Sequence, residues 1–158
     1  MQKMTQEKMK NSEMRNNEMK ENEWRFREEM QNAGLRLTRN RRRIFEVLEM
    51  VDRPLTVQQI AKTLVGEVHF TSVYRSIETL TQARLLREIP RGFKNYYELG
   101  EMFRPHHHHV TCGHCGRSLA IDDPRIEKLM RELTLRAGLM PTHHNFEMFG
   151  VCRKCRRQ

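Results

Sequence analysis

Four cysteines form two pairs with the spacing of metal-binding knuckles. Cys112 and Cys115 make the first pair, and Cys152 and Cys155 make the second, with two residues between the thiols of each. Two thiolates at this spacing bind one metal ion, and two pairs supply the four sulfurs of a closed tetrahedral zinc site. The N-terminus shows no secretory signal pattern, so we expect the cytoplasm, where reducing conditions favour bound metal over disulfides. The sequence therefore predicts that the four cysteines bind structural Zn²⁺, in preference to forming a thioredoxin-like redox pair or disulfides.

Histidines gather directly before the first cysteine pair. Seven of the eight histidines lie between residues 106 and 144, and four of them are consecutive. In an extended strand, alternate side chains point to opposite faces, so His107 and His109 would share one face and His106 and His108 the other. One strand would then serve two metal sites, against the alternative of solvated loop histidines. Each imidazole pair needs further ligands, and the candidates of suitable chemistry are Glu98, Glu127 and either His143 or His144.

A strand–helix–strand unit must bring the two cysteine pairs together. We expect a strand over 117–121, a helix capped by Asp123 with Pro124 at its first position, Gly138 after the last turn, and a strand over 144–150. The helix is expected to bury Ile126, Leu129, Met130 and Leu133. Zinc would then cross-link both ends of a unit of about 50 residues, which is near the lower size limit for an independently stable core.

The apolar pattern before residue 100 predicts three helices and a β-hairpin. Caps are expected at Thr38 for the first helix and at Thr56 for the second, and the third helix should begin near residues 71–72. A strand pattern follows over 85–99, interrupted by a turn at 90–92. This order of elements is that of a winged helix-turn-helix. The expected fold class is therefore α+β, with a winged-helix domain followed by a small α/β domain.

The N-terminal end of the third helix carries side chains suited to reading bases. In a winged helix-turn-helix this end enters the major groove, where Arg75 can donate two hydrogen bonds to a guanine and Tyr74 can pack on a thymine methyl group. Thr71 and Ser72 add small hydroxyls at the same end. A net charge of +9 agrees with a nucleic-acid partner. Basic residues around the start of the first helix would contact phosphate, among them Arg36, Arg39 and Arg41.

Residues 1–30 differ in composition from the rest of the chain. Methionine recurs every five residues from Met4 to Met19, a step that scatters side chains around a helix. We expect a low-complexity extension that is partly helical at best, and we prefer this interpretation to that of an arm that binds a soft metal. The winged-helix domain is expected over 31–100 and the metal-binding domain over 101–158. No apolar run approaches the roughly 18 residues of a membrane span, so no membrane partner is expected.

Together these features resemble the ferric uptake regulator family of metal-dependent bacterial repressors. The resemblance covers about 33–155 and rests on A-G-L-R-L-T-R from Ala33, T-S-V-Y-R from Thr71, Y-E-L from Tyr97, H-H-H-H-x-x-C-x-x-C from His106 and H-x-F-E-x-x-G-x-C-x-x-C from His144. It implies a homodimer, joined by the C-terminal domain, that binds double-stranded operator DNA when metal fixes the angle between its domains. Tyr74 and Arg75 fall on the family's DNA-reading pair, and Arg36 falls on a position that faces the minor groove.

The resemblance also implies the ligands of the metal sites. The four cysteines fall on the structural zinc site, and Glu98, His107 and His109 fall on an interdomain regulatory site. A second site in the dimerisation domain would use His106, Glu127, His144 and His108, the last in place of a usual Asp.

Three positions depart from the family pattern and bear on the metal. Pro54 stands where one regulatory ligand is often a His, so His69, Glu88 or a water molecule is left to complete that sphere. Ala120 stands where the peroxide-sensing branch has an Asp, and Leu99–Gly100 lacks the Cys of the zinc-uptake branch. For the regulatory metal we rank Fe²⁺ ahead of Zn²⁺, with Mn²⁺ or Ni²⁺ after them.

Two other functions compete with a metal-responsive repressor. A zinc-stabilised winged helix could bind protein instead of DNA. A zinc hydrolase could use the histidine run, but the chain lacks H-E-x-x-H and offers no separate general base. We therefore expect a protein that is not an enzyme.

Overall fold

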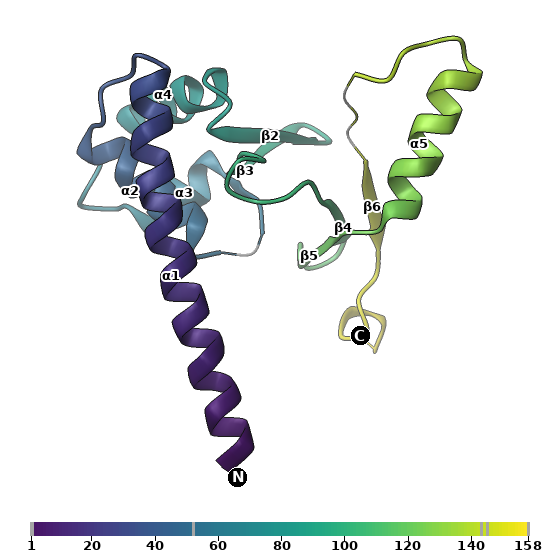
Figure 1. Cartoon of the computed structure of the whole chain (residues 1–158), viewed down its shortest axis with the longest axis horizontal. Coiled ribbons are helices and arrows are strands. Elements are labelled where there is room, and N and C mark those ends of the chain that lie inside the picture. Colours follow the sequence, from purple (N-terminus) through teal and green to yellow (C-terminus); the bar gives the residue numbers. More distant parts are fainter. Residues whose placement is uncertain (1, 52, 143, 145, 158) are drawn as a thin grey trace.

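The computed structural model describes residues 2–51, 53–142, 144 and 146–157, with side chains from residue 17 onward. Two lobes are joined by a linker at residues 100–107 (Figure 1). The winged-helix lobe contains α1 (Gln2–Asn32), α2 (Arg39–Glu49), α3 (Val57–Thr63) and α4 (Phe70–Gln82). Its antiparallel sheet has the order β1-β3-β2, formed by β1 (Leu55–Thr56), β2 (Leu86–Arg91) and β3 (Lys94–Leu99). The expected α+β fold class is confirmed.

Local capping sets where the helices of this lobe begin. Thr38 Oγ1 accepts a hydrogen bond from the Arg41 amide (3.3 Å) at the start of α2. At α3, Thr56 and Gln59 form the expected capping box, with reciprocal bonds of 2.9 and 3.2 Å. Helix α4 begins at Phe70, slightly before the expected start, because the His69 ring accepts from the Thr71 amide (3.4 Å) and caps the helix.

The N-terminal segment is a correction to the sequence-based expectation. Residues 2–32 form one continuous helix, and its C-terminal half belongs to the core of the winged-helix lobe. Phe26 and Met30 are fully buried, and the Phe26 ring stacks on Phe45 with centroids 4.2 Å apart. The physical reason is a stripe at helical spacing, Met19, Asn22, Phe26 and Met30, which the five-residue methionine repeat obscures. The prediction of a low-complexity extension over residues 1–30 is therefore wrong for the last turns of α1, which are part of the core.

Length does not make this helix a membrane segment. Among the described residues, no helix combines the length and the apolar character needed to cross a membrane.

The second lobe is a three-stranded sheet with one helix. Strands β4 (His108–Cys112), β5 (Ser118–Ile121) and β6 (Glu147–Gly150) lie in the order β5-β4-β6, with β4 antiparallel to β5 and parallel to β6. Helix α5 (Pro124–Arg136) has the expected cap at Asp123 and connects β5 to β6. A short 3₁₀ turn, η1 (Cys155–Arg157), follows β6. Gly138 ends α5 with a φ of +75°, a conformation that suits glycine.

The apolar stripe of α5 is not buried, which corrects the expectation from the sequence: Ile126 and Met130 are half-buried, and the other two members are exposed. Leu129 and Leu133 are 54% and 51% exposed, and no residue of α5 is buried among those described. Leu119 on β5 is also exposed, as is Phe149, which the strand register places on the opposite face of the sheet. The reason is that α5 stands at the outer side of a small sheet, away from the winged-helix lobe (Figure 1). One chain therefore leaves this apolar surface uncovered.

Candidate metal centres and nucleic-acid interface

The first candidate centre is formed by the four cysteines. Cys112 ends β4, Cys115 follows in the turn, and Cys152 and Cys155 lie just after β6, so the parallel pairing of β4 and β6 brings the two pairs together. One sulfur from each lies within 4.8 Å of the others, and the sulfurs of Cys115 and Cys152 are 3.8 Å apart. These are free thiols in the structure. Four convergent sulfurs of this kind are the donor set of a closed zinc site.

The electrostatics of the four thiols favour a bound cation. The Cys152 amide donates to Cys112 Sγ at 3.3 Å, and such backbone bonds lower the pKa of the Cys112 thiol to about 6. The hydrogen bond with Cys152 and then burial raise the pKa of Cys155 to about 12. Four sulfurs this close do not all ionise at neutral pH without compensating charge, because each thiolate disfavours the next. A divalent metal supplies that charge, so the residues fit the ion.

The second candidate centre spans the two lobes. Glu98 is buried on β3 of the winged-helix lobe, whereas His107 immediately precedes β4 and His109 lies on it. Glu98 Oε2 is 2.8 Å from Nε2 of His109 and 3.4 Å from Nε2 of His107. Strand alternation directs these two rings to the face that meets the winged-helix lobe. We call this set the interlobe cluster.

Hydrogen bonding prepares the interlobe cluster for a cation. The Pro105 carbonyl can only accept, so His107 Nδ1 donates to it (2.9 Å) and Nε2 is left to face Glu98. Burial raises the pKa of Glu98, but the bonds from His107 and His109 outweigh it and bring that pKa to about 2. The bond to Glu98 likewise raises the pKa of His107. A metal ion can replace the proton shared by these atoms, so the donor set fits a divalent cation.

The third candidate centre lies on the other face of the same strand. Glu127 Oε1, from α5, is 2.7 Å from Nε2 of His108, 3.2 Å from Nε2 of His144 and 3.3 Å from Nε2 of His106. Nδ1 of His108 is buried and has no hydrogen-bond partner among the described residues. Three imidazoles converging on one carboxylate oxygen form a second nitrogen and oxygen donor set, the second-lobe cluster.

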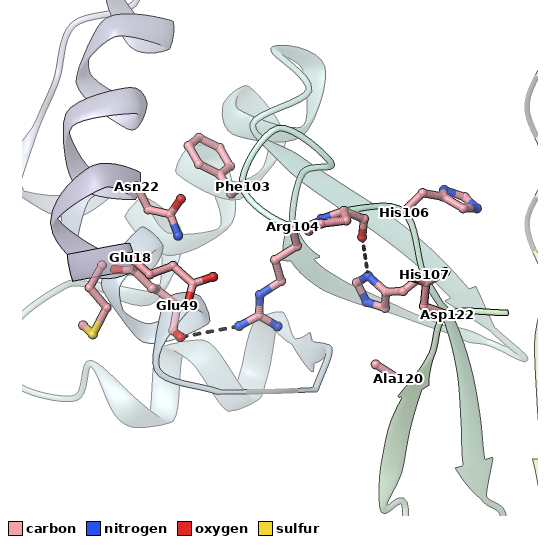
Figure 2. A pocket seen from close by; sticks show the side chains of 11 residues that line it. Glu18, Asn22, Glu49, Phe103, Arg104, His106, His107, Ala120 and Asp122 are labelled. Atoms are coloured by element: carbon pink, nitrogen blue, oxygen red, sulfur yellow. Dashed lines mark hydrogen bonds between the residues drawn. The ribbon is translucent and has the colours of Figure 1, made fainter. Parts of the chain in front are cut away.

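A cavity of about 430 Å³ borders both histidine clusters and is shown in Figure 2. His106 and His107 line one side, and the carboxylates of Glu18 and Asp122 add negative charge that attracts cations. The linker is fixed here: Arg104 donates to the carbonyl of Val51 at 2.8 Å, and Arg25 donates to that of Met102 at 2.6 Å. Strand β4 therefore starts from a point fixed to the winged-helix lobe.

Several residues considered from the sequence do not join a cluster. His69 caps α4, and Glu88 lies across the hairpin from Tyr97, so neither completes the interlobe cluster. Within the described part of the chain, only Glu98, His107 and His109 place donor atoms together there. His114 is exposed outside the sulfur set. The alternative ligand His143 lies outside the described residues.

Other groups around the clusters went unnoticed in the sequence. His106 Nδ1 lies 2.8 Å from Glu101 Oε1, Ser118 Oγ lies 3.4 Å from His109 Nδ1, and Arg87 Nη1 lies 3.9 Å from Glu98 Oε1. Such outer contacts orient ligand rings and tune their basicity. No spacing rule marks these residues, because the contacts form only when separate elements meet.

The candidate nucleic-acid interface is the first turns of α4 together with the basic segment before α2. Tyr74 is 55% exposed, and Thr71 and Arg75 are also exposed, while Ser72 is half-buried. Other arginine side chains in this region bind groups of the protein itself. Arg41 donates to the Arg36 carbonyl at 2.6 Å, and Arg42 and Arg43 form ion pairs with Glu23, Glu46 and Glu67. Arg36 and Arg39 are exposed beside them.

Several known proteins are similar to this chain in both sequence and fold. Residues 32–149 match the sequence profile described as the ferric uptake regulator family. The ferric uptake regulation protein of Klebsiella pneumoniae is 31% identical over 128 residues, which cover 78% of this chain and 81% of that protein. The solved Vibrio cholerae ferric uptake regulator has a TM-score of 0.68 at 26% identity, covering 78% of this chain and 96% of that one.

A second solved structure extends the match in fold. The Helicobacter pylori ferric uptake regulator, described as having three functional metal binding sites, has a TM-score of 0.72 at 23% identity. It covers 87% of this chain and 93% of that one.

Proposed function

Because the chain belongs to the ferric uptake regulator family of metal-responsive transcriptional regulators, we propose that it is a homodimeric repressor whose interlobe cluster senses the metal. Members of this family bind DNA and are not enzymes. The observation that supports this assignment is the cluster itself, which joins Glu98 of the winged-helix lobe to His107 and His109 of the second lobe. A metal held there supplies positive charge and coordinate bonds that favour one arrangement of the lobes. Metal and operator DNA then stabilise the same state, and each tightens the binding of the other.

We assign different roles to the other two centres. The four cysteines would hold structural Zn²⁺ and cross-link the two ends of the second lobe. Reducing conditions keep the thiols free to bind metal, so we propose that the protein works in the cytoplasm. The second-lobe cluster would bind a further divalent ion within 101–158, the proposed metal-binding dimerisation domain. His106, His108 and His144 are its nitrogen donors and Glu127 its oxygen donor.

The donor chemistry ranks the regulatory metals. Two imidazoles and one carboxylate suit Fe²⁺, Zn²⁺, Mn²⁺ and Ni²⁺, and the absence of sulfur from the described donor set agrees with Fe²⁺ first. Proteins of this fold have been solved with iron (Francisella tularensis) and with manganese (Pseudomonas aeruginosa). With Pro54 in place of a His, we propose that water completes the sphere.

Double-stranded operator DNA is the proposed partner of the winged-helix domain, 31–100. Helix α4 would enter the major groove, where Arg75 reads a base, Tyr74 packs beside it, and Thr71 and Ser72 contact the groove wall. Arg36, Arg39 and Arg41 would contact phosphate or the minor groove. A zinc uptake regulator of the same fold has been solved with zinc and DNA.

A second copy of the chain is the proposed occupant of the exposed apolar surface. Leu129 and Leu133 on α5, and Leu119 on β5, are exposed on one lobe. A patch of this kind marks an association surface, and a two-fold homodimer buries the same patch on both copies. The dimer would present two winged helices to two operator half-sites.

The function is tested by DNA selection followed by quantitative binding. Random double-stranded DNA is selected on the zinc-loaded protein with Mn²⁺ as the probe metal, and binding of the enriched sequence is measured by fluorescence anisotropy with and without Mn²⁺. We expect sequence-specific binding that needs the metal. Arg75→Ala should weaken it by about 1–3 kcal/mol and relax one base preference, whereas Arg41→Ala should lower affinity for all sequences and flatten the salt dependence. No enriched sequence, or equal binding without metal, would contradict the proposal.

A further inference from the structure

The side chain at the tip of the wing points away from solvent. Arg91 ends β2, at the turn of the β2–β3 hairpin, where a basic residue would ordinarily reach toward a DNA phosphate. Its side chain is only 7% exposed, and its guanidinium lies over the Tyr96 ring, 4.8 Å from the centroid. Phe93 in the turn and Lys94, which opens β3 opposite Arg91, are exposed. The wing therefore offers Lys94 to solvent and withdraws Arg91.

Arg91 binds a carboxylate of the other lobe. Its Nε lies 2.7 Å from both carboxylate oxygens of Glu147, and its Nη2 lies 2.5 Å from Oε1. Glu147 opens β6 and its side chain is 10% exposed, so two opposite charges meet across the lobes largely shielded from solvent. Figure 1 shows the hairpin reaching from the helices toward this sheet. A guanidinium that makes several bonds to one carboxylate fixes direction as well as distance.

Ser118 connects this ion pair to the interlobe cluster. Its hydroxyl lies 3.4 Å from Arg91 Nη2, 3.0 Å from Thr111 Oγ1 and 3.4 Å from His109 Nδ1. Nε2 of the same His109 ring faces Glu98 at 2.8 Å. One buried hydroxyl thus touches both the ion pair between the lobes and the ring that would bind the regulatory metal.

We propose that Arg91 and Glu147 form an interlobe latch that holds the two lobes together without metal and, through Ser118, positions His109 against Glu98. Among the described ligands of the interlobe cluster, only Glu98 comes from the winged-helix lobe, so its distance to the histidines depends on how the lobes dock. The latch keeps that docking in the metal-free protein. Arg91 and Glu147 are positioning residues in this account. The latch between the lobes does not depend on the proposed function. Only its effect on metal affinity rests on that function.

The latch has a measurable effect on metal affinity. A ligand that binds only the docked arrangement has an apparent affinity reduced by the fraction of molecules in that arrangement. Removing one charge leaves its partner buried and uncompensated, which opposes docking, whereas removing both removes the conflict. We therefore expect each single variant to bind metal about tenfold more weakly, and the double variant to be no weaker than either single variant.

The test uses the full zinc-loaded chain and a double-mutant cycle. The proteins are wild type, Arg91→Gln, Glu147→Gln, the double variant, and Lys94→Gln as a matched control at an exposed position of the same hairpin. Hydrogen exchange is measured on metal-free protein without DNA, and Mn²⁺ affinity is measured by calorimetry. In each single variant, exchange should rise together in the β2–β3 turn and in β6, and Mn²⁺ should bind about tenfold more weakly. Lys94→Gln should match wild type in both.

Each alternative outcome has a distinct reading. Wild-type exchange in Glu147→Gln, or additive effects in the double variant, would overturn the latch. Equal Mn²⁺ affinity in all five proteins would contradict the positioning of His109. If Mn²⁺ fails to bind even the wild type, the proposed sensor function fails, while the exchange measurement still decides whether the latch exists.

Discussion

Each of the four consecutive histidines differs from the next in what its Nδ1 atom contacts. His106 Nδ1 faces the Glu101 carboxylate, His107 Nδ1 donates to the Pro105 carbonyl, and His109 Nδ1 lies near Ser118. These contacts leave Nε2 as the atom that faces Glu98 or Glu127. Four identical residues therefore serve two separate clusters: strand alternation determines the face, and in His106, His107 and His109 the Nδ1 contact leaves Nε2 as the donor atom.

The proposed structural role of the cysteines predicts a coupled loss of metal and assembly. Cys152→Ser removes one of four sulfurs, and the remaining three cannot close a tetrahedral site. Elemental analysis should show about one zinc fewer per chain than wild type, and light scattering should show that the dimer is lost. His114→Ala, inside the first knuckle but outside the sulfur set, should keep both. A folded, zinc-free dimer of Cys152→Ser would refute the structural role.

A buried carboxyl predicts a pH dependence of stability. Burial raises the pKa of Glu49, and its Oε1 has no hydrogen-bond partner among the described residues. The folded protein therefore holds a proton here that the unfolded chain releases from about pH 4.5 upward, so stability decreases as pH rises through the raised pKa.

Glu49→Gln should remove that decrease. In denaturant unfolding, the variant should gain stability relative to wild type as pH increases from 5 to 7, because an amide at this position has no charge to bury. Glu28→Gln, on an exposed part of α1, should track wild type. A constant difference between Glu49→Gln and wild type across this range would contradict the buried-acid explanation.

At the scale of elements, α1 is the part of the molecule that changes the account most. It lies almost wholly before residue 32, where the family match begins, yet its last turns complete the core and hold the linker through Arg25 and Met102. Phe26 contacts both Phe45 and Phe103, so one ring connects α1, α2 and the linker. The helix is thus part of the scaffold that positions the interlobe cluster.

The contribution of α1 is tested by a pair of aromatic substitutions two residues apart. Phe26→Ala should lower the free energy of unfolding by about 3–5 kcal/mol, because it removes a fully buried ring. Trp24→Ala removes a larger ring that is 63% exposed and should change stability by about 0.5 kcal/mol or less. Chemical denaturation of the full chain measures both. Similar small changes for the two variants would mean that α1 does not pack as described.

The sequence predicts elements well where the signal is local. The capping box at Thr56 and Gln59, the Asp123 cap and the alternation of the histidine run each depend on residues within one element, and each is found in the structure. The burial of Phe26 and the exposure of Leu133 depend on which other elements lie nearby. In α1 the five-residue methionine repeat obscures the stripe of helical spacing that is buried, and in α5 the periodicity does not say whether a neighbour covers the stripe, so both expectations were wrong.

At the scale of the molecule, one short strand connects every candidate centre. Strand β4 begins after a linker fixed to the winged-helix lobe, carries histidines to both of its faces, and ends in the first cysteine pair. A change in the docking of the lobes therefore alters the interlobe cluster, which has ligands from both lobes, more than the second-lobe cluster, which has ligands from the second lobe and the end of the linker. This difference predicts that the two clusters separate by mutation.

The proposed role of the interlobe cluster is that of the metal sensor. It is tested most directly by Mn²⁺-titrated binding of selected DNA to wild type, His109→Ala and His108→Ala, with zinc content and dimer mass recorded for each. His109→Ala should lose metal-dependent DNA binding while it keeps its zinc and its dimer. His108→Ala should still respond to Mn²⁺, with a shifted midpoint or a less stable dimer. Equal Mn²⁺ midpoints for all three proteins would contradict the account.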